Sequence, residues 1–377
     1  MKKRVISILM VGALAMGLVT GCGSRGNTQD SQGSSKGSSG EKVTLSVLAG
    51  QSTTDAGIEE FIDAALEKKY PEIKLEWECV DWGNDFQPKM QQYMQSGLPD
   101  IMIGKAQDVQ IYAGTGNLAK ISDSYLGKIK KDALKEVTVD GAVYGIPYNA
   151  WYQGVIYNKD IFQKYKLTPP TTREGLEVVA CLERKGIVPF ASHFQESWEV
   201  ANMTMQYMMN EIFDKMPDWG DQFRKGTKNY EGNAEVQNCF KNNQFILNHT
   251  WEDAFQIDQF ECDNRFVRGE AAMYLTGSWS MQFSSQYGKD IDFGIFPFPN
   301  QAGDAKLIKE TNMTFMKSAK TEQEDLIDQI FNRLLSDRKL AQEIADFTQT
   351  SSLIEGVTDN SQNKIQSDIQ SYEEKNE

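Results

Sequence analysis

The sequence predicts an α/β protein in two lobes, with mostly parallel sheets wrapped by helices. In residues 43–104, short apolar runs alternate with stretches of helical spacing, and this β-α-β-α-β order is typical of a parallel sheet. The same alternation returns in residues 171–280. The chain of 377 residues is also too long for one small core.

The elements expected in the first half are a strand at 43–50, a helix at 55–69, a strand at 73–79, a helix ending at 97 and a strand at 100–104. Pro71 stops the first helix. Apolar and charged side chains then alternate from Ile73 to Cys79, which is the period of a half-exposed strand. The following helix ends at Gly97, and the run DIMIG predicts a buried strand.

The elements expected in the second half are a helix at 171–186, a strand at 187–192, a Met-rich helix at 198–213, a strand at 271–275 and an amphipathic helix or helix pair at 324–347. Thr171 and Glu174 have the spacing of a capping box. Methionines at helical spacing fill cores more often than they bind a metal. Residues 358–377 are polar and weakly patterned.

The N-terminus has the three parts of a secretory signal peptide. Lys2, Lys3 and Arg4 precede an apolar run at 5–19, and Cys22 follows small residues, as in the bacterial lipobox, where the thiol is lipidated. An uncleaved membrane anchor is the alternative, but the run is short for a bilayer and contains glycines. The segment 23–42 has no aliphatic or aromatic side chain, so it predicts a flexible tether.

Charge and composition exclude several functions. The formal net charge is −14, and phosphate binding needs basic patches, so nucleic acid is disfavoured as a partner. His193 and His249 are the only histidines, which gives little support for a zinc site or a histidine-based catalytic site. Beyond Cys22 the sequence cannot choose a pairing for Cys79, Cys181, Cys239 and Cys262; a Cys239–Cys262 bridge and the unpaired state stay open.

Five segments in order resemble the extracellular solute-binding protein family 1, the sugar-type receptors of ABC importers that include the maltose-binding protein. They are KVTLSVLAG, GLPDIMIG, VYGIPYNAWYQGVIYNKDIFQKY, NRFVRGEAAMYLTGSWS and DIDFGIFPFPN. The resemblance implies a type II periplasmic-binding-protein fold whose lobes close on a ligand in the cleft between them. It places the crossovers near 149–155 and 293–298, with the helix after Thr321 returning to the first lobe.

The expected boundaries are signal peptide 1–21, lipidated cysteine and tether 22–42, lobe 1 43–150, lobe 2 151–292, return to lobe 1 293–349 and a shortened C-terminal segment 350–377. Members of the family commonly continue through more C-terminal helices. The short polar end of this chain therefore leaves one side of the cleft in question.

The candidate ligand contacts lie after strands or in a crossover: Gln51, Ser52, Trp82, Lys105, Gln107, Asp108, Tyr148, Asn149, Trp151, Glu196, Trp198 and Trp279. Loops at the carboxyl ends of strands face the crevice of an α/β protein. Sugar sites combine flat aromatic platforms with amides and carboxylates.

The resemblance assigns particular roles to some of these residues. Trp279 matches the stacking tryptophan of the family, with a core tryptophan as the alternative. Trp151 stands where the maltose receptor has a sugar-binding carboxylate, which suggests a different sugar surface. Glu196 and Trp198 match a ligand-contacting helix start, although a carboxylate there also favours the helix dipole. For Asn149, packing within the hinge is an equally good alternative to ligand contact.

The function expected is a lipid-anchored receptor on the outer face of a bacterial membrane. It would be a monomer without catalysis or cofactor, and would deliver a mono- or oligosaccharide to the permease subunits of an ABC importer. A surface glycoside hydrolase is the alternative, but no motif marks the two carboxylates that such an enzyme needs. An adhesion or sensor lipoprotein on the same fold is a third possibility.

Overall fold

The computed structural model describes residues 42–51, 57–82, 85–285, 287, 290–358 and 364–375. The expected signal peptide and Cys22 lie outside these residues. Within the described part of the chain, no helix is both long enough and apolar enough to cross a membrane.

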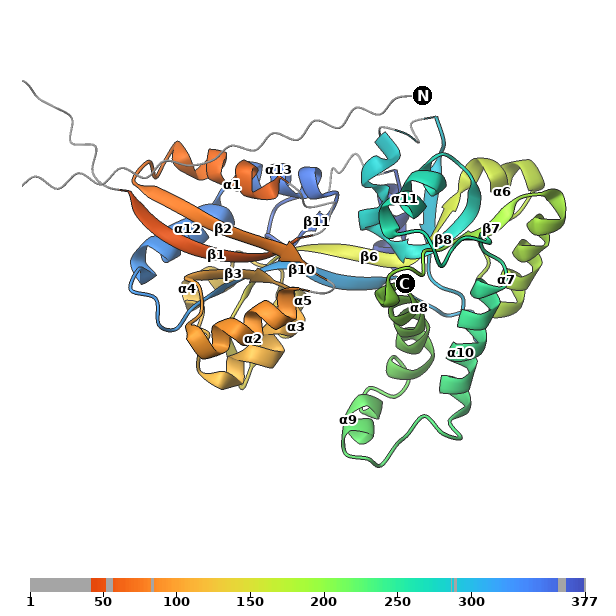
Figure 1. Ribbon diagram of the computed structural model, residues 1–377, viewed down its shortest axis with the longest axis horizontal. Helices are drawn as coiled ribbons and strands as arrows, with labels where there is room; N and C mark the ends of the chain where they lie inside the picture. Colours follow the sequence, from red (N-terminus) through yellow and green to blue (C-terminus); the bar gives the residue numbers. More distant parts are fainter. Residues whose placement is uncertain are drawn as a thin grey trace, which may run out of the picture. The chain divides into compact units, whose positions relative to one another are not determined.

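One nine-stranded sheet runs through this part of the chain (Figure 1). Its strands are β1 (Val43–Gln51), β2 (Ile73–Asp81), β3 (Ile101–Gly104), β6 (Ile146–Asn158), β7 (Val188–Ala191), β8 (Ala271–Gly277), β9 (Phe293–Phe296), β10 (Ile308–Lys317) and β11 (Ser351–Ser352). The order is β2-β1-β3-β10-β6-β8-β7, with β9 and β11 also paired to β6. A separate hairpin joins β4 (Thr138–Val139) to β5 (Ala142–Val143).

The α/β class is confirmed, but the sheet is mixed rather than mostly parallel. The parallel pairs are β1 with β2, β1 with β3, and β7 with β8. Strand β10 runs antiparallel to β3 and β6, and β6 runs antiparallel to β8, β9 and β11. Strands β10 and β6 thus join the parallel unit of β1, β2 and β3 to the parallel pair of β7 and β8. These two strands are not part of a β-α-β alternation in the sequence.

The helices before β7 are α1 (Ile58–Glu67), α2 (Phe86–Ser96), α3 (Ala106–Tyr112), α4 (Asp123–Leu126), α5 (Lys131–Glu136), α6 (Lys159–Tyr165) and α7 (Arg173–Val179). Those after it are α8 (Ser197–Met208), α9 (Trp219–Arg224), α10 (Ala234–Leu247), α11 (Gln259–Val267), α12 (Glu324–Ser336), α13 (Arg338–Thr348) and α14 (Gln366–Lys375). Short 3₁₀ turns lie at η1 (Ala113–Thr115), η2 (Ala180–Lys185) and η4 (Ser278–Ser285), and α8 continues as a π-helical turn, η3 (Met209–Phe213).

Four buried clusters divide between the two lobes. In lobe 1, one cluster packs α1, α12 and α13 against the sheet and another packs α2 and α3 against it (Figure 1). In lobe 2, one cluster includes side chains of α6, α8 and α10, and the other includes side chains of α11 and α14. Along β6, Ala150 belongs to a lobe 1 cluster and Tyr152 to a lobe 2 cluster. Strand β6 therefore passes from the lobe 1 core to the lobe 2 core at Trp151.

Several local predictions can be compared with the structure. The segment 324–347 is a helix pair, because the Asp337 carboxylate accepts a hydrogen bond from Leu340 N at 3.1 Å and starts α13. The capping residue of α7 is Thr172 rather than Thr171, since its hydroxyl accepts a hydrogen bond from Gly175 N. Cys79, Cys181, Cys239 and Cys262 are all free thiols, so a Cys239–Cys262 bridge is wrong.

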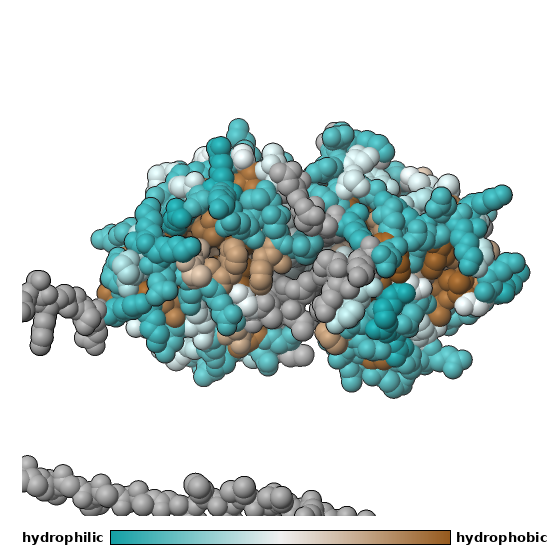
Figure 2. Space-filling view, turned by 90° about the horizontal axis from the view of Figure 1, so that it is seen from above, coloured by the Kyte–Doolittle hydropathy of each residue, from teal (hydrophilic) through white to brown (hydrophobic). Residues whose placement is uncertain are grey.

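The crossover predicted at 293–298 is also wrong. Strand β9 pairs with the end of β6, and its side chains belong to the lobe 2 clusters. Strand β10 makes the return instead, because it pairs with β6 and then with β3. On the face drawn in Figure 2, hydrophilic side chains cover most of the surface and the hydrophobic ones form separate patches.

The C-terminal segment is divided between the lobes: Leu353, Ile354 and Val357 belong to a lobe 1 cluster, and α14 belongs to lobe 2. Ile365 and Ile369 are fully buried beside α11, although the segment 358–377 looks polar in sequence. The α14 carboxylate of Asp368 lies 3.2 Å from Lys159 Nζ and accepts a hydrogen bond from Ile295 N. Helix α14 thus closes one side of the lobe 2 core.

Ile369→Ala should lower the free energy of unfolding by about 2–5 kcal/mol, because it leaves a cavity under α14. Urea unfolding measures the change. Glu374→Ala, on the exposed side of α14, is the control and should stay within about 0.5 kcal/mol of the parent. If the urea unfolding curves of the two variants had the same midpoint and the same slope, α14 would not pack as described.

Candidate functional site

The carboxyl ends of β2 and β3 place Trp82 and Lys105 close together. The indole of Trp82 lies against the backbone of Gly50 at the end of β1, where a β-carbon would come within 2.3 Å of the ring. Lys105 precedes α3, and its ammonium nitrogen lies 5.6 Å from the ring centroid of Trp82. The glycine therefore permits the tryptophan to lie over the strand.

Lys105 is the centre of a small polar network. Its Nζ lies 3.0 Å from Glu310 Oε1 on β10, and Gln153 Nε2 on β6 donates a hydrogen bond to Glu310 Oε2 at 2.6 Å. The ammonium also lies 5.6 Å from the ring centroid of Trp151. A cation between two indole faces is attracted to both rings.

Trp151 and Trp279 complete the arrangement. Their ring centroids are 5.0 Å apart with a 60° angle between the planes. The Trp279 ring folds over Gly277, where a β-carbon would lie 2.0 Å from it. Both tryptophans are buried, yet neither belongs to any of the four hydrophobic clusters. Trp151 Nε1 is a buried donor without a hydrogen-bond partner in the described structure.

We call this group the tryptophan site: Trp82, Lys105, Trp151, Gln153, Trp279 and Glu310. A cavity of about 490 Å³ adjoins it at Glu310. The lining residues are Ala106, Gln107, Gln110, Lys135, Glu136, Thr138, Glu310 and Thr311. Gln107 is thus an exposed amide beside the tryptophan site, where the sequence predicts a contact.

Three predicted contacts are buried away from the cleft. Tyr148 is wrong as a ligand contact, because its ring lies in a lobe 1 cluster and its hydroxyl donates to Leu334 O at 3.1 Å. Asn149 is buried in β6, and its amide donates to Thr348 Oγ1, which fits the hinge-packing alternative. Asp108 is also buried.

The carboxylate of Asp108 holds Lys105 in place rather than facing a ligand. It accepts hydrogen bonds from Lys105 N, at 2.7 Å, and from the Gln87 amide. Burial raises the pKa of Asp108, although these hydrogen bonds and the Lys105 charge oppose the shift. Gln51 lies in β1 at the same end of the sheet. Ser52 lies outside the described residues.

Glu196 and Trp198 lie together at the start of α8 in lobe 2. Glu196 Oε2 accepts a hydrogen bond from Gln259 N and lies 2.8 Å from Nδ1 of the buried His193. The pKa of Glu196 is lowered, first of all by the hydrogen bond with His193. The half-buried Trp198 ring packs on His193 with centroids 4.9 Å apart.

Sequence reasoning missed Gln153, Glu310 and His193. A pattern was available for Gln153, because it lies two residues after Trp151 on the same face of a strand. Glu310 had no local signal; the pairing of β10 with β6 sets it opposite Trp151.

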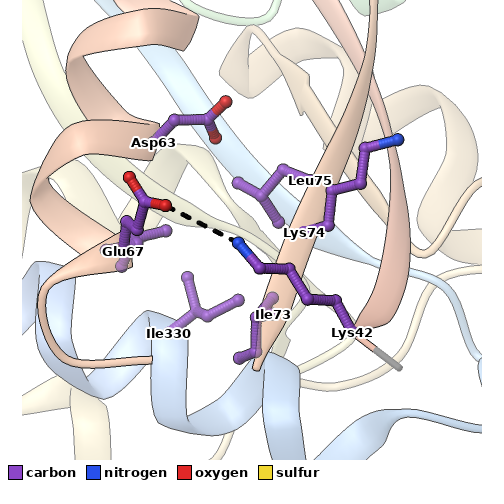
Figure 3. Close-up of a pocket in the computed structure, with 8 residues that line it drawn as sticks. Lys42, Asp63, Glu67, Ile73, Lys74, Leu75 and Ile330 are labelled. Carbon is purple, nitrogen blue, oxygen red and sulfur yellow. Dashed lines mark ion pairs between the residues drawn. The ribbon is translucent and has the colours of Figure 1, made fainter. Parts of the chain in front are cut away.

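A different cavity, of about 150 Å³, lies on lobe 1 between α1, β2 and α12 (Figure 3). Lys42, Asp63 and Glu67 point into it around an apolar floor, and Lys42 Nζ lies 3.6 Å from Glu67 Oε1. It contains no aromatic side chain and borders β2 at Ile73, the start of that strand. The tryptophan site is therefore the stronger candidate for ligand binding.

The chain belongs to the bacterial extracellular solute-binding protein family, whose model matches residues 49–347. An uncharacterized ABC transporter extracellular-binding protein of Pyrococcus horikoshii is 26% identical over 347 residues, covering 84% of this chain and 74% of that protein. The multiple sugar-binding protein of Streptococcus mutans is 23% identical over 294 residues, covering 75% and 68%.

Solved structures share the fold at lower identity. A chitin oligosaccharide binding protein has a TM-score of 0.74 at 20% identity and covers 88% of this chain and 87% of its own. The solute-binding protein RafE in complex with raffinose has a TM-score of 0.73 at 19% identity, covering 85% of each chain. A Bacillus licheniformis sugar transporter in complex with stachyose has a TM-score of 0.74 at 16% identity, covering 88% and 87%. These likenesses support the two-lobed type II fold.

Gly277→Ala should displace the Trp279 indole, because the new methyl group would occupy the position of the ring. We expect a changed near-UV circular dichroism spectrum and a loss of about 1–3 kcal/mol in unfolding free energy. Gly114→Ala is the control, since a β-carbon there meets no atom within 4 Å. An unchanged spectrum for Gly277→Ala would contradict the placement of Trp279.

Proposed function

We propose that the protein is the sugar-capturing receptor of an ABC importer and binds its ligand at the tryptophan site. One observation carries this proposal. The indoles of Trp82, Trp151 and Trp279 lie close to the Lys105–Glu310 ion pair and the Gln153 amide. These residues come from both lobes and from the strands between them. Indole faces match the C–H faces of a sugar ring, and the polar groups match its hydroxyls.

The charge of the site favours a neutral ligand. The ammonium of Lys105 and the carboxylate of Glu310 are 3.0 Å apart, so they neutralise each other. Among the described residues the Trp151 Nε1 donor has no hydrogen-bond partner, and a ligand hydroxyl could accept its hydrogen bond. The sugar-binding names of relatives, and the raffinose, stachyose and chitin oligosaccharides of structural neighbours, agree with this class of ligand.

Reversible binding fits the site better than hydrolysis. Glycoside hydrolysis requires two carboxyl groups on either side of the scissile bond. The tryptophan site contains one carboxylate, Glu310, which is held in an ion pair with Lys105. We infer that the ligand is released unchanged to a permease.

Anchoring to the membrane is part of the same proposal. Cys22 follows a signal-peptide pattern, and lipidation of its thiol would hold the receptor near the permease. Cys22→Ala should abolish labelling by a fatty-acid probe in a bacterial host. Cys181→Ala, which changes an exposed thiol, is the control and should label fully. Equal labelling of both variants would contradict the anchor.

A thermal-shift screen of residues 43–377 tests the ligand class, with raffinose, stachyose, chitin oligosaccharides and galactose as probes. A ligand at about 100 times its Kd should stabilise the protein by about 2.7 kcal/mol. A complete absence of shifts at millimolar sugar would argue against the proposal.

Trp279→Ala should weaken binding of the best sugar by about 2–4 kcal/mol, or about 30-fold to nearly 1000-fold, since an aromatic anchor is lost. Titration calorimetry measures the affinity, and urea unfolding measures the stability of the ligand-free variant. Trp77→Ala is the matched control, because Trp77 lies on β2 and bonds to Asp63 in lobe 1. Lost stability with unchanged affinity in Trp279→Ala would make it a core residue.

A further inference from the structure

The indoles at the centre of the tryptophan site are covered by other protein groups. Only 5% of the surface of Trp151 and 7% of that of Trp279 is exposed. A sugar ring stacks on the face of an aromatic ring, and this contact needs a face that the ligand can reach. A protein group that covers these faces therefore has to move before a sugar can stack on them.

Lys105 covers two of the three indoles. Its ammonium nitrogen lies over the ring of Trp82 and over the ring of Trp151, at 5.6 Å from each ring centroid. A cation at this distance from an indole face is attracted to the ring. The ammonium thus occupies the space above each ring that the C–H face of a sugar would take.

The side chain of Lys105 is also the part of the site that can move most easily. Two of the three indoles lie on strand-end glycines, and the third belongs to β6. The backbone of Lys105 is held as well, because its N–H donates a hydrogen bond to Asp108 at 2.7 Å. The four-carbon side chain of a lysine is flexible, however, and 23% of this one is exposed. Rotation of this side chain would uncover the indoles without moving a strand.

Glu310 holds the ammonium in its position over the rings. Its Oε1 lies 3.0 Å from Lys105 Nζ, and its Oε2 accepts a hydrogen bond from Gln153 Nε2 at 2.6 Å. Gln153 therefore orients the carboxylate toward the lysine. Once the ammonium leaves, Oε1 of Glu310 can accept a hydrogen bond from a sugar hydroxyl, so the same carboxylate serves both partners in turn.

We propose that Lys105 competes with the sugar for the tryptophan site: its ammonium covers the indole faces of Trp82 and Trp151 and has to leave them before a sugar ring can stack there. This inference rests on the proposed function for the ligand. A protein whose binding-competent state is only partly populated binds with an affinity lowered by that fraction. Lys105 therefore lowers the affinity for sugar, and its removal strengthens binding.

The binding test measures the affinities of the intact protein for raffinose and for stachyose by titration calorimetry. Lys105→Ala should bind about 5- to 30-fold more tightly than the parent, because the sugar no longer displaces a cation from two indole faces. Lys105→Met keeps most of the side-chain volume without the charge, and it should also bind more tightly. This second variant decides the question if the alanine variant folds poorly.

Lys89→Ala is the matched control. Lys89 is another lobe 1 lysine that lies over an aromatic ring, 5.7 Å from the centroid of Tyr93, and it also forms an ion pair with a glutamate, Glu78. Its removal should change the affinity for either sugar by less than about 2-fold. Weaker binding by the Lys105 variants would mean that the ammonium contacts the ligand, and unchanged affinity would mean that it does not oppose binding. Either result would overturn the inference.

Acrylamide quenching of tryptophan fluorescence tests the cover without a sugar. Lys105→Ala should raise the quenching constant, because acrylamide then reaches the faces of Trp82 and Trp151. The same substitution in a Trp151→Phe background should raise it less, and Lys89→Ala should leave it unchanged. An equal quenching constant in the parent and Lys105→Ala would show that Lys105 does not cover the indoles. If neither protein binds either sugar, the proposed function fails, and quenching alone decides whether Lys105 covers the indoles.

Discussion

The pairing of β6 with β10 is the constraint on which the rest of the molecule depends. All residues of β6 are buried, and the strand leaves one set of cores and enters the other at Trp151. In the same register, β10 sets Glu310 opposite Trp151. The two connecting strands therefore also build the tryptophan site, so movement of the lobes about them would change that site directly.

Glycines let the tryptophans lie where this pairing needs them. The rings of Trp82 and Trp279 rest on the backbone at Gly50 and Gly277, each at the end of a strand. A β-carbon at either position would overlap the ring, so the ring could not keep this place. The tryptophan ring and the glycine at the strand end therefore depend on each other, which is why the sequence GSWS in lobe 2 was recognisable as a tryptophan at a strand end.

Periodicity in the sequence predicted the elements well where one helix or strand buries one face. It identified β1, β2, β3, α1 and the α12–α13 pair. The resemblance predicted Trp279 and Trp151 as ligand contacts, and the structure places their rings side by side. Periodicity could not predict Glu310, because that residue acquires its neighbours only through pairing with a distant strand. The resemblance also assigned Tyr148 to the cleft, because it places the whole crossover there and does not reveal that this ring enters the lobe 1 core.

The electrostatics of the two lobes differ in a way that suits their roles. Lobe 1 contributes Lys105, which forms an ion pair with Glu310 and lies near two indole faces. Lobe 2 contributes buried acids around a single imidazole, whose charge depends on protons. A net charge of −14 surrounds both. A neutral ligand experiences little of that acidic field.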